Sequence, residues 1–123
     1  MVQPLRSYRD LIVWQKSKAF VKNAYVITAS FPPGERFGLA SQMRRAAVSI
    51  PSNIAEGRGR STRKDFVSFL RIALGSVYEL ETQFEIAKDL GFVSDVPYNE
   101  SIASLKEIGR MLSAMIAKLK AGS

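Results

Sequence analysis

The chain has 123 residues, of which 46% are hydrophobic, so it is long and apolar enough for one domain with one core. It contains no histidine and no cysteine, which excludes disulfides and thiolate chemistry and removes the commonest general base and the commonest metal ligands. The net charge of +7 favours anionic partners, and no apolar stretch approaches the roughly 18 to 20 residues of a membrane span.

The first predicted element is a helix over residues 8–30. Its start is marked by Ser7-Tyr8-Arg9-Asp10, which is typical of a capping box with Asp10 at the position that Glu or Gln usually takes. Two adjacent rows of apolar residues follow at helical spacing and form a broad apolar face. Trp14 lies in the second row, where an indole is either a core or subunit contact or a platform on which a base can stack.

The second predicted helix covers residues 35–57 and follows the turn Pro32-Pro33-Gly34. Its inward-facing positions recur at helical spacing, and we expect them to be Phe37, Ala40, Met43, Ala47, Ile50 and Ile54. Pro51 interrupts this pattern because it lacks an N–H and crowds the carbonyl of Ala47, at a cost of roughly 3 kcal/mol in an unconstrained helix. The side chains expected to compensate, by bonding to a freed backbone group, are Ser49, Ser52 and Asn53.

The third and fourth helices are predicted over residues 62–90 and 97–120, and Gly91 is the expected C-terminal cap between them. The third helix has the most regular apolar seam, which consists of Phe66, Leu70, Ala73, Val77, Leu80, Phe84 and Ala87. Gly75 and Ser76 lie in mid-helix, where glycine costs about 1 kcal/mol relative to alanine, so we expect a close helix approach there.

Four amphipathic helices joined by short turns predict an all-α fold, an antiparallel up-and-down four-helix bundle. The first and last helices carry more apolar rows than one bundle must bury, which indicates subunit contacts in a homo-oligomer. The alternative is a monomer with a thick core. We expect a single domain over residues 1–123 in the cytoplasm, without contact with a membrane.

The positive charge is concentrated in the middle third of the sequence. Residues 36–71 hold eight basic and two acidic residues, for a net charge of +6, whereas residues 72–123 have a net charge of −2. Seven of the eight cations are arginines, which bind phosphate through a planar fork. The residues that we expect to contact nucleic acid are Arg44, Arg45, Arg58, Arg60, Arg63, Lys64 and Arg71.

The basic run from Arg58 to Lys64 has no interleaved aromatic residues, so we expect contacts to the backbone of RNA or DNA rather than stacking on bases. Such binding should depend strongly on salt. The alternative is that these arginines are solvated surface residues, with Arg63 paired locally and Arg44 or Arg45 bonded to Glu56 or to a neighbouring subunit.

We expect no catalytic residue, no metal and no cofactor. Glu56 ends the second helix beside arginines, and we interpret it as part of an ion pair because no second catalytic group accompanies it. Gly57-Arg58-Gly59 lacks the preceding strand and the spacing of a phosphate-binding loop. The acidic residues of the third helix lack the paired histidines of a di-metal bundle and are interpreted as a solvated face: Glu79, Glu81, Glu85 and Asp89.

The segment from Arg44 to Gly57, which reads RRAAVSIPSNIAEG, and the later residues Phe66, Leu70, Ala73, Gly75-Ser76 and Glu79-Leu80-Glu81 carry a resemblance. The chain resembles, from about Tyr8 to about Leu119, the bacterial four helix bundle protein family, which includes proteins encoded in intervening sequences of ribosomal RNA genes. It is similar, more distantly, to the accessory variability protein of diversity-generating retroelements. The motif residues within this segment are Pro51, Asn53, Glu56 and Gly57.

The resemblance implies a bundle that assembles as a homopentamer and has no established enzymatic activity, with nucleic-acid binding attributed to some relatives. Three hypotheses follow. The first is a nucleic-acid-binding bundle that serves as an accessory to a nucleic-acid-processing protein. The second is a scaffold whose basic patch docks an acidic protein. The third is an enzyme that uses Glu56, Tyr78 or a lysine.

Overall fold

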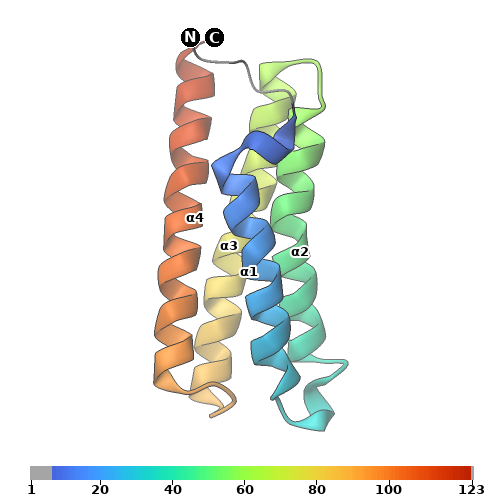
Figure 1. Ribbon diagram of the computed structural model, residues 1–123, viewed down its shortest axis with the longest axis vertical. Helices are drawn as coiled ribbons and strands as arrows, with labels where there is room; N and C mark the ends of the chain where they lie inside the picture. The colour runs from blue at the N-terminus through green and yellow to red at the C-terminus, as the bar shows by residue number, and fades with distance from the viewer. Residues whose placement is uncertain (1–6, 123) are drawn as a thin grey trace.

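The computed structural model describes residues 7–122, and within that range the chain is all-α and has no strands. Residues 1–6 and 123 of the expected domain lie outside this range. Four long helices follow one another: α1 (Ile12–Ala29), α2 (Leu39–Arg58), α3 (Arg63–Asp89) and α4 (Asp95–Ala121). They run alternately down and up the long axis of the molecule (Figure 1), and α1 also contacts α4, which closes the bundle.

One apolar core runs through the bundle and receives side chains from all four helices. The predicted seam of α3 supplies most of its centre, because Leu70, Val77 and Phe84 are completely buried. Phe20 of α1 meets Phe84 edge to face, with ring centroids 6.0 Å apart. The four-helix arrangement expected from the apolar spacing is therefore confirmed.

The first helix is divided at its start. The predicted capping box is present, because Ser7 Oγ accepts from the N–H of Arg9 at 3.0 Å and the Asp10 carboxylate accepts from the N–H of Ser7 at 3.4 Å. It caps a short 3-10 helix, η1 (Tyr8–Asp10), and Leu11 is extended before α1 begins. The expected helix over residues 8–30 is thus a 3-10 turn followed by an α-helix.

The predicted start of the second helix was wrong. A second 3-10 helix, η2 (Pro33–Glu35), occupies the turn, and α2 begins only at Leu39. Phe37 was expected in the core but is 88% exposed. Because Phe37 precedes the helix, helical spacing does not determine its direction, and Ala40 is the first residue of the predicted row to be buried.

Pro51 is buried inside α2, and the helix continues through it to Arg58. Two of the three predicted compensating side chains make hydrogen bonds there. Asn53 Nδ2 donates to the carbonyl oxygen of Ser49 at 2.8 Å and to Ser49 Oγ at 2.9 Å. Ser49 and Ser76 share a hydrogen bond of 2.9 Å, which ties α2 to α3. Asn53 therefore bonds the carbonyl of Ser49 rather than that of Ala47, and Ser52 is exposed.

The close helix approach lies at Gly57 and not at Gly75. A Cβ at Gly57 would lie 2.6 Å from Phe69 Cβ and 3.0 Å from Phe66 Cδ1, so α2 can meet α3 there only because the side chain is absent. A Cβ at Gly75 would meet nothing within 4 Å, which contradicts the expectation for that residue.

The end of α3 confirms the predicted glycine cap. Gly91 has a φ of +77°, and the N–H groups of Gly91 and Phe92 donate to the carbonyls of Lys88 and Ala87. This is the Schellman arrangement, which satisfies two carbonyls that the helix leaves free. The next helix begins at Asp95, two residues earlier than expected, because Pro97 is tolerated in the first turn.

Candidate nucleic-acid interface

The seven cations expected to bind nucleic acid lie in two separate regions. Arg44 and Arg45 are in the first half of α2, whereas Arg58 is in its last turn. At 1.5 Å per residue the fourteen positions from Arg44 to Arg58 span about 21 Å. Arg60, Arg63 and Lys64 follow at the end of the bundle where α2 meets α3. The structure thus separates the first two arginines from the other five residues.

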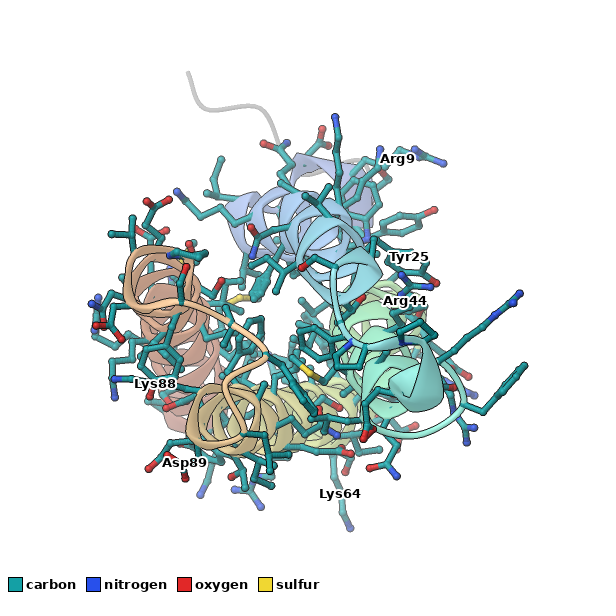
Figure 2. The ribbon with its side chains drawn as sticks, turned by 90° about the horizontal axis from the view of Figure 1, so that it is seen from below. Arg9, Tyr25, Arg44, Lys64, Lys88 and Asp89 are labelled. Carbon is teal, nitrogen blue, oxygen red and sulfur yellow. The ribbon has the colours of Figure 1, made fainter. Side chains whose placement is uncertain are left out.

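Arg44 is engaged within its own chain. Its Nε donates to Thr28 Oγ1 at 2.8 Å, and its terminal nitrogen donates to the carbonyl of Tyr25 at 3.4 Å. The guanidinium also lies over the Tyr25 ring, 4.6 Å from its centroid, and Figure 2 shows the two side chains together on the α1–α2 side of the bundle. Within the described residues Arg44 therefore joins α2 to α1 through Thr28 and Tyr25, and not through Glu56.

Arg45 lies on a different side of α2 from Arg44, beside α3. It is exposed and lines a groove between α2 and α3 together with Phe37, Ser49 and Glu79. Because a carboxylate lines the same groove, this surface is of mixed charge.

Glu56 forms an ion pair with Arg60, which confirms the interpretation of Glu56 as part of an ion pair. Glu56 Oε1 lies 2.9 Å from the terminal nitrogen of Arg60, one helical turn further on, and both side chains are about half exposed. The Arg60 guanidinium also lies over the Phe69 ring, 4.8 Å from its centroid. Exposed pairs of this kind contribute roughly 0 to 1 kcal/mol. Arg60 is thus partly neutralised, and Arg58 beside it is half-buried.

The remaining predicted cations line a groove between the start of α3 and the end of α4, with a volume of about 520 Å³. We call it the basic groove. It is lined by Arg63, Lys64, Val67, Ser68, Arg71, Leu119 and Lys120. Lys64 and Arg71 are exposed, and Figure 2 shows Lys64 pointing away from the bundle on the α3 side.

Sequence reasoning did not predict the other residues that line this groove: Val67, Ser68, Leu119 and Lys120. Lys120 lies more than fifty positions after Arg63, and the two meet because the antiparallel fold brings the last turn of α4 beside the first turn of α3. The sequence signal that could have predicted Lys120 is the basic last turn of α4, which contains Lys118 and Lys120.

The electrostatic surroundings of the basic groove favour an anion. Among the described residues that line it, four are cationic and none is acidic. Arg63 donates a hydrogen bond to the carbonyl of Gly122 at the end of α4, which fixes one side of its guanidinium and leaves other N–H donors for a ligand. The start of α3, which Thr62 caps, adds the positive end of a helix dipole.

Four of the five acidic residues of α3 lie in the second half of that helix, away from the basic groove, whereas Asp65 lies in its first turn and does not line the groove. Glu79, Glu81, Glu85 and Asp89 follow Arg71 along the chain, and Glu81 lies 3.6 Å from Lys106 of α4. Within residues 7–122 no group of three carboxylates is arranged to hold a metal ion. The α3–α4 side of the bundle is therefore basic at one end and acidic toward the other.

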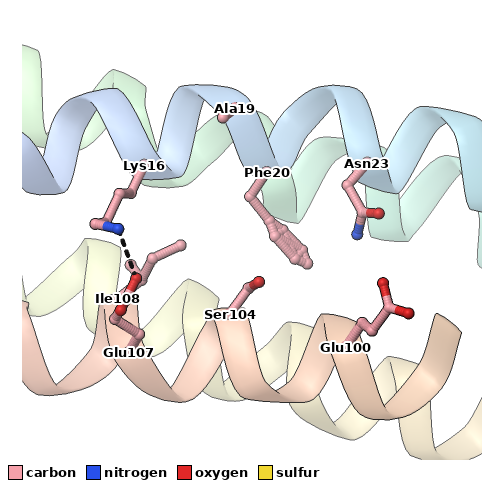
Figure 3. A pocket seen from close by; sticks show the side chains of 8 residues that line it. All are labelled: Lys16, Ala19, Phe20, Asn23, Glu100, Ser104, Glu107 and Ile108. Atoms are coloured by element: carbon pink, nitrogen blue, oxygen red, sulfur yellow. Dashed lines mark ion pairs between the residues drawn. The ribbon is translucent and has the colours of Figure 1, made fainter. Parts of the chain in front are cut away.

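Another pocket, between α1 and α4, also has mixed charge (Figure 3). Lys16 Nζ lies 2.9 Å from Glu107 Oε1 across it, and Asn23 donates to Ser101 Oγ at 3.0 Å. Glu100 lines the same pocket, so its two carboxylates oppose the binding of a polyanion.

Trp14 is half-buried and packs against the core. Tyr8 meets it edge to face, with ring centroids 5.1 Å apart, and Arg9 and Lys18 lie 5.7 Å and 5.3 Å from its centroid. A stacking base would have to displace these neighbours. No helix in the described part of the chain combines the length and apolarity needed to cross a bilayer.

Comparisons with known proteins agree with this fold. Residues 9–114 match the family described as 23S rRNA-intervening sequence protein. A solved structure from Bacteroides thetaiotaomicron, described as a protein with unknown function from the S23 ribosomal protein family, superposes with a TM-score of 0.79. It is 25% identical in sequence, and the match covers 86% of this chain and 96% of that one. No protein with a curated description matches the sequence.

Proposed function

Because the chain belongs to the 23S rRNA-intervening sequence protein family, we propose that it is a non-enzymatic helical bundle that binds the backbone of RNA or DNA through the basic groove. The name of the family associates its members with intervening sequences of 23S rRNA, which supports a role beside nucleic acid. An accessory role beside a separate nucleic-acid-processing protein fits a chain whose binding is electrostatic and independent of sequence.

The observation that carries this proposal is the basic groove itself. Four cations from two helices surround one concave surface, and no acidic side chain among the described lining residues opposes them. Phosphate contacts of this kind supply most of non-specific nucleic-acid affinity through the release of counterions.

Self-association is the second part of the proposal. The resemblance implies a homopentamer, and exposed apolar side chains on several helices offer contact surface, among them Val26, Ile72 and Val96. A ring of five copies would present five basic grooves to one polyanion and so raise its avidity. The absolute mass in solution tests this: a pentamer has five times the 13.6 kDa of one chain, and a mass of 13.6 kDa at micromolar concentration contradicts it.

A protein-binding scaffold is the alternative, and one observation favours it. Phe37 is 88% exposed before the start of α2, with the Arg36 guanidinium 5.3 Å from its ring centroid. Exposed aromatic and arginine side chains are typical anchors of protein interfaces. In that case the basic groove would dock an acidic protein surface instead of a nucleic acid.

An electrophoretic mobility shift at low salt distinguishes these functions. We expect the full chain to shift RNA and DNA oligonucleotides, and the double variant Lys64→Gln/Arg71→Gln to lose most of that binding. The matched control is Lys22→Gln/Arg36→Gln, which removes the same charge from exposed positions outside the groove and should bind normally. Failure of the full chain to bind either nucleic acid at low salt would contradict the proposal and favour the scaffold.

A further inference from the structure

We infer that the basic groove seats one unpaired nucleotide, so that the chain prefers single-stranded nucleic acid to a duplex. This inference rests on the proposed function and adds to it the kind of nucleic acid bound. It comes from the contrast between the rim of the groove and its floor.

The rim of the groove is cationic. Arg63, Lys64 and Arg71 follow one face of α3, and Lys120 faces them from α4. Lys64 and Arg71 are exposed and lie seven residues apart, so about two helical turns, or roughly 10 Å, separate their backbones. Successive phosphates of one strand can be held along such a row.

The floor of the groove is apolar. It consists of Val67, which is buried, and Leu119, which is half-buried and packs against the core. A phosphate makes no favourable contact with an apolar floor. The face of an unstacked base can cover this floor and release the water that lies on it. Ser68, at the exposed edge, adds a hydroxyl that can donate to or accept from any base.

The size of the groove agrees with this occupant. Its volume of about 520 Å³ lies within the roughly 300 to 1,000 Å³ of pockets that hold small ligands. A duplex keeps the faces of its bases stacked inside and presents its backbone and base edges, so it can contact the cations but cannot cover the floor with the face of a base. A single strand can turn one base inward while its phosphates stay on the rim.

The same chemistry would be met by an anionic lipid, with its headgroup on the rim and its chain on the floor. Two aliphatic side chains offer little apolar surface for a long acyl chain, whereas one flat base can cover both of them. The observations therefore favour the nucleotide, and the lipid becomes an outcome of the test.

Competition between a 12-nucleotide single strand and a 12-base-pair duplex tests the inference. We expect the full chain to bind the single strand about tenfold more tightly than the duplex, in line with the apolar contact that one base makes with the aliphatic floor. Ser68→Leu fills the groove without removing a charge and should weaken single-strand binding more than duplex binding, which brings the ratio of the two affinities close to one. Ser52→Leu places the same side chain at an exposed position on α2 and should preserve the preference.

A second readout does not depend on a long ligand. In methyl NMR spectra, adenosine 5′-monophosphate should shift the resonances of Val67 and Leu119, whereas inorganic phosphate should leave them in place. Equal or tighter binding of the duplex, or an unchanged preference in Ser68→Leu, would overturn the inference and leave the proposed function standing. Absence of binding to any nucleic acid would overturn both, as would binding to phosphatidylglycerol vesicles alone.

Discussion

Arg44 and Arg45 are neighbours in sequence, yet their surroundings differ completely. Successive residues of an α-helix point about 100° apart, so Arg44 faces α1 and Arg45 faces the groove beside α3. Both were expected to contact nucleic acid, because residue type alone cannot distinguish a guanidinium that bonds to its own chain from one that faces solvent. The hydrogen bonds of Arg44 depend on Thr28 and Tyr25, which only the folded bundle places within reach.

Replacement of Arg44 by alanine should therefore destabilise the protein, whereas replacement of Arg45 should not. Arg44→Ala removes two hydrogen bonds from a charged donor and a cation–π contact, and we expect a loss of about 1.5 to 3 kcal/mol in the free energy of unfolding. Arg45→Ala should change it by less than about 0.5 kcal/mol. Urea unfolding of both variants measures this, and equal stabilities would show that Arg44 does not join the helices.

Gly57 provides the second prediction at this scale. Gly57→Ala places a Cβ 2.6 Å from Phe69 Cβ, so the helices must separate, and overpacking of this kind costs about 1 to 3 kcal/mol. The control is Gly75→Ala, where the Cβ meets nothing within 4 Å and the gain in helix propensity is up to about 1 kcal/mol. Thermal unfolding should thus move in opposite directions for the two variants, and a Gly57→Ala protein as stable as Gly75→Ala would refute the close approach.

At the scale of the helices, the apolar seams correctly predicted that four helices form, but they did not predict where α1 and α2 begin. The seam of α3 determined its burial because the helix packs along its whole length. The turns before α1 and α2 instead contain 3-10 helices, whose three-residue period differs from that of the α-helix. Phe37 follows η2 and so falls outside the register of the apolar residues that were assigned to its helix.

The end of α3 was predicted correctly because its signal is local. Gly91 has a φ of +77°, a region that costs other residues about 1 to 2 kcal/mol, and nothing lies near its missing Cβ. Gly91→Ala should therefore lower the free energy of unfolding by about that amount through backbone strain alone. Gly34→Ala, which also meets open space but lacks a positive φ, should have little effect on chemical denaturation. A neutral Gly91→Ala variant would contradict the strained cap.

At the scale of the whole molecule, the candidate site depends on topology. Arg63, Lys64 and Arg71 were expected from a local excess of charge, but Lys120 and Leu119 reach them only through the antiparallel packing of α4 on α3. Arg44 and Arg45 lie apart from the groove because about 20 Å of α2 separates them from Arg58. Charge counted along a sequence locates a basic segment, whereas a concave basic surface requires knowledge of which helix ends meet.

The uneven distribution of charge along the α3–α4 side also follows from this arrangement. α3 runs from basic to acidic and α4 runs from acidic to basic, so the two antiparallel helices place their cations at the same end. A polyanion is therefore attracted to one end of this side and repelled from the other, where Glu85 and Asp89 lie.

The salt dependence of RNA affinity tests most directly whether the basic groove holds a polyanion. For a single strand, log K falls against log salt concentration with a slope of about −0.7 for each phosphate contacted. Lys64→Gln/Arg71→Gln should therefore reduce the magnitude of the slope by about 1.4, whereas Lys22→Gln/Arg36→Gln should leave it as it is in the unmodified chain. Equal slopes for the two double variants would contradict binding in the groove.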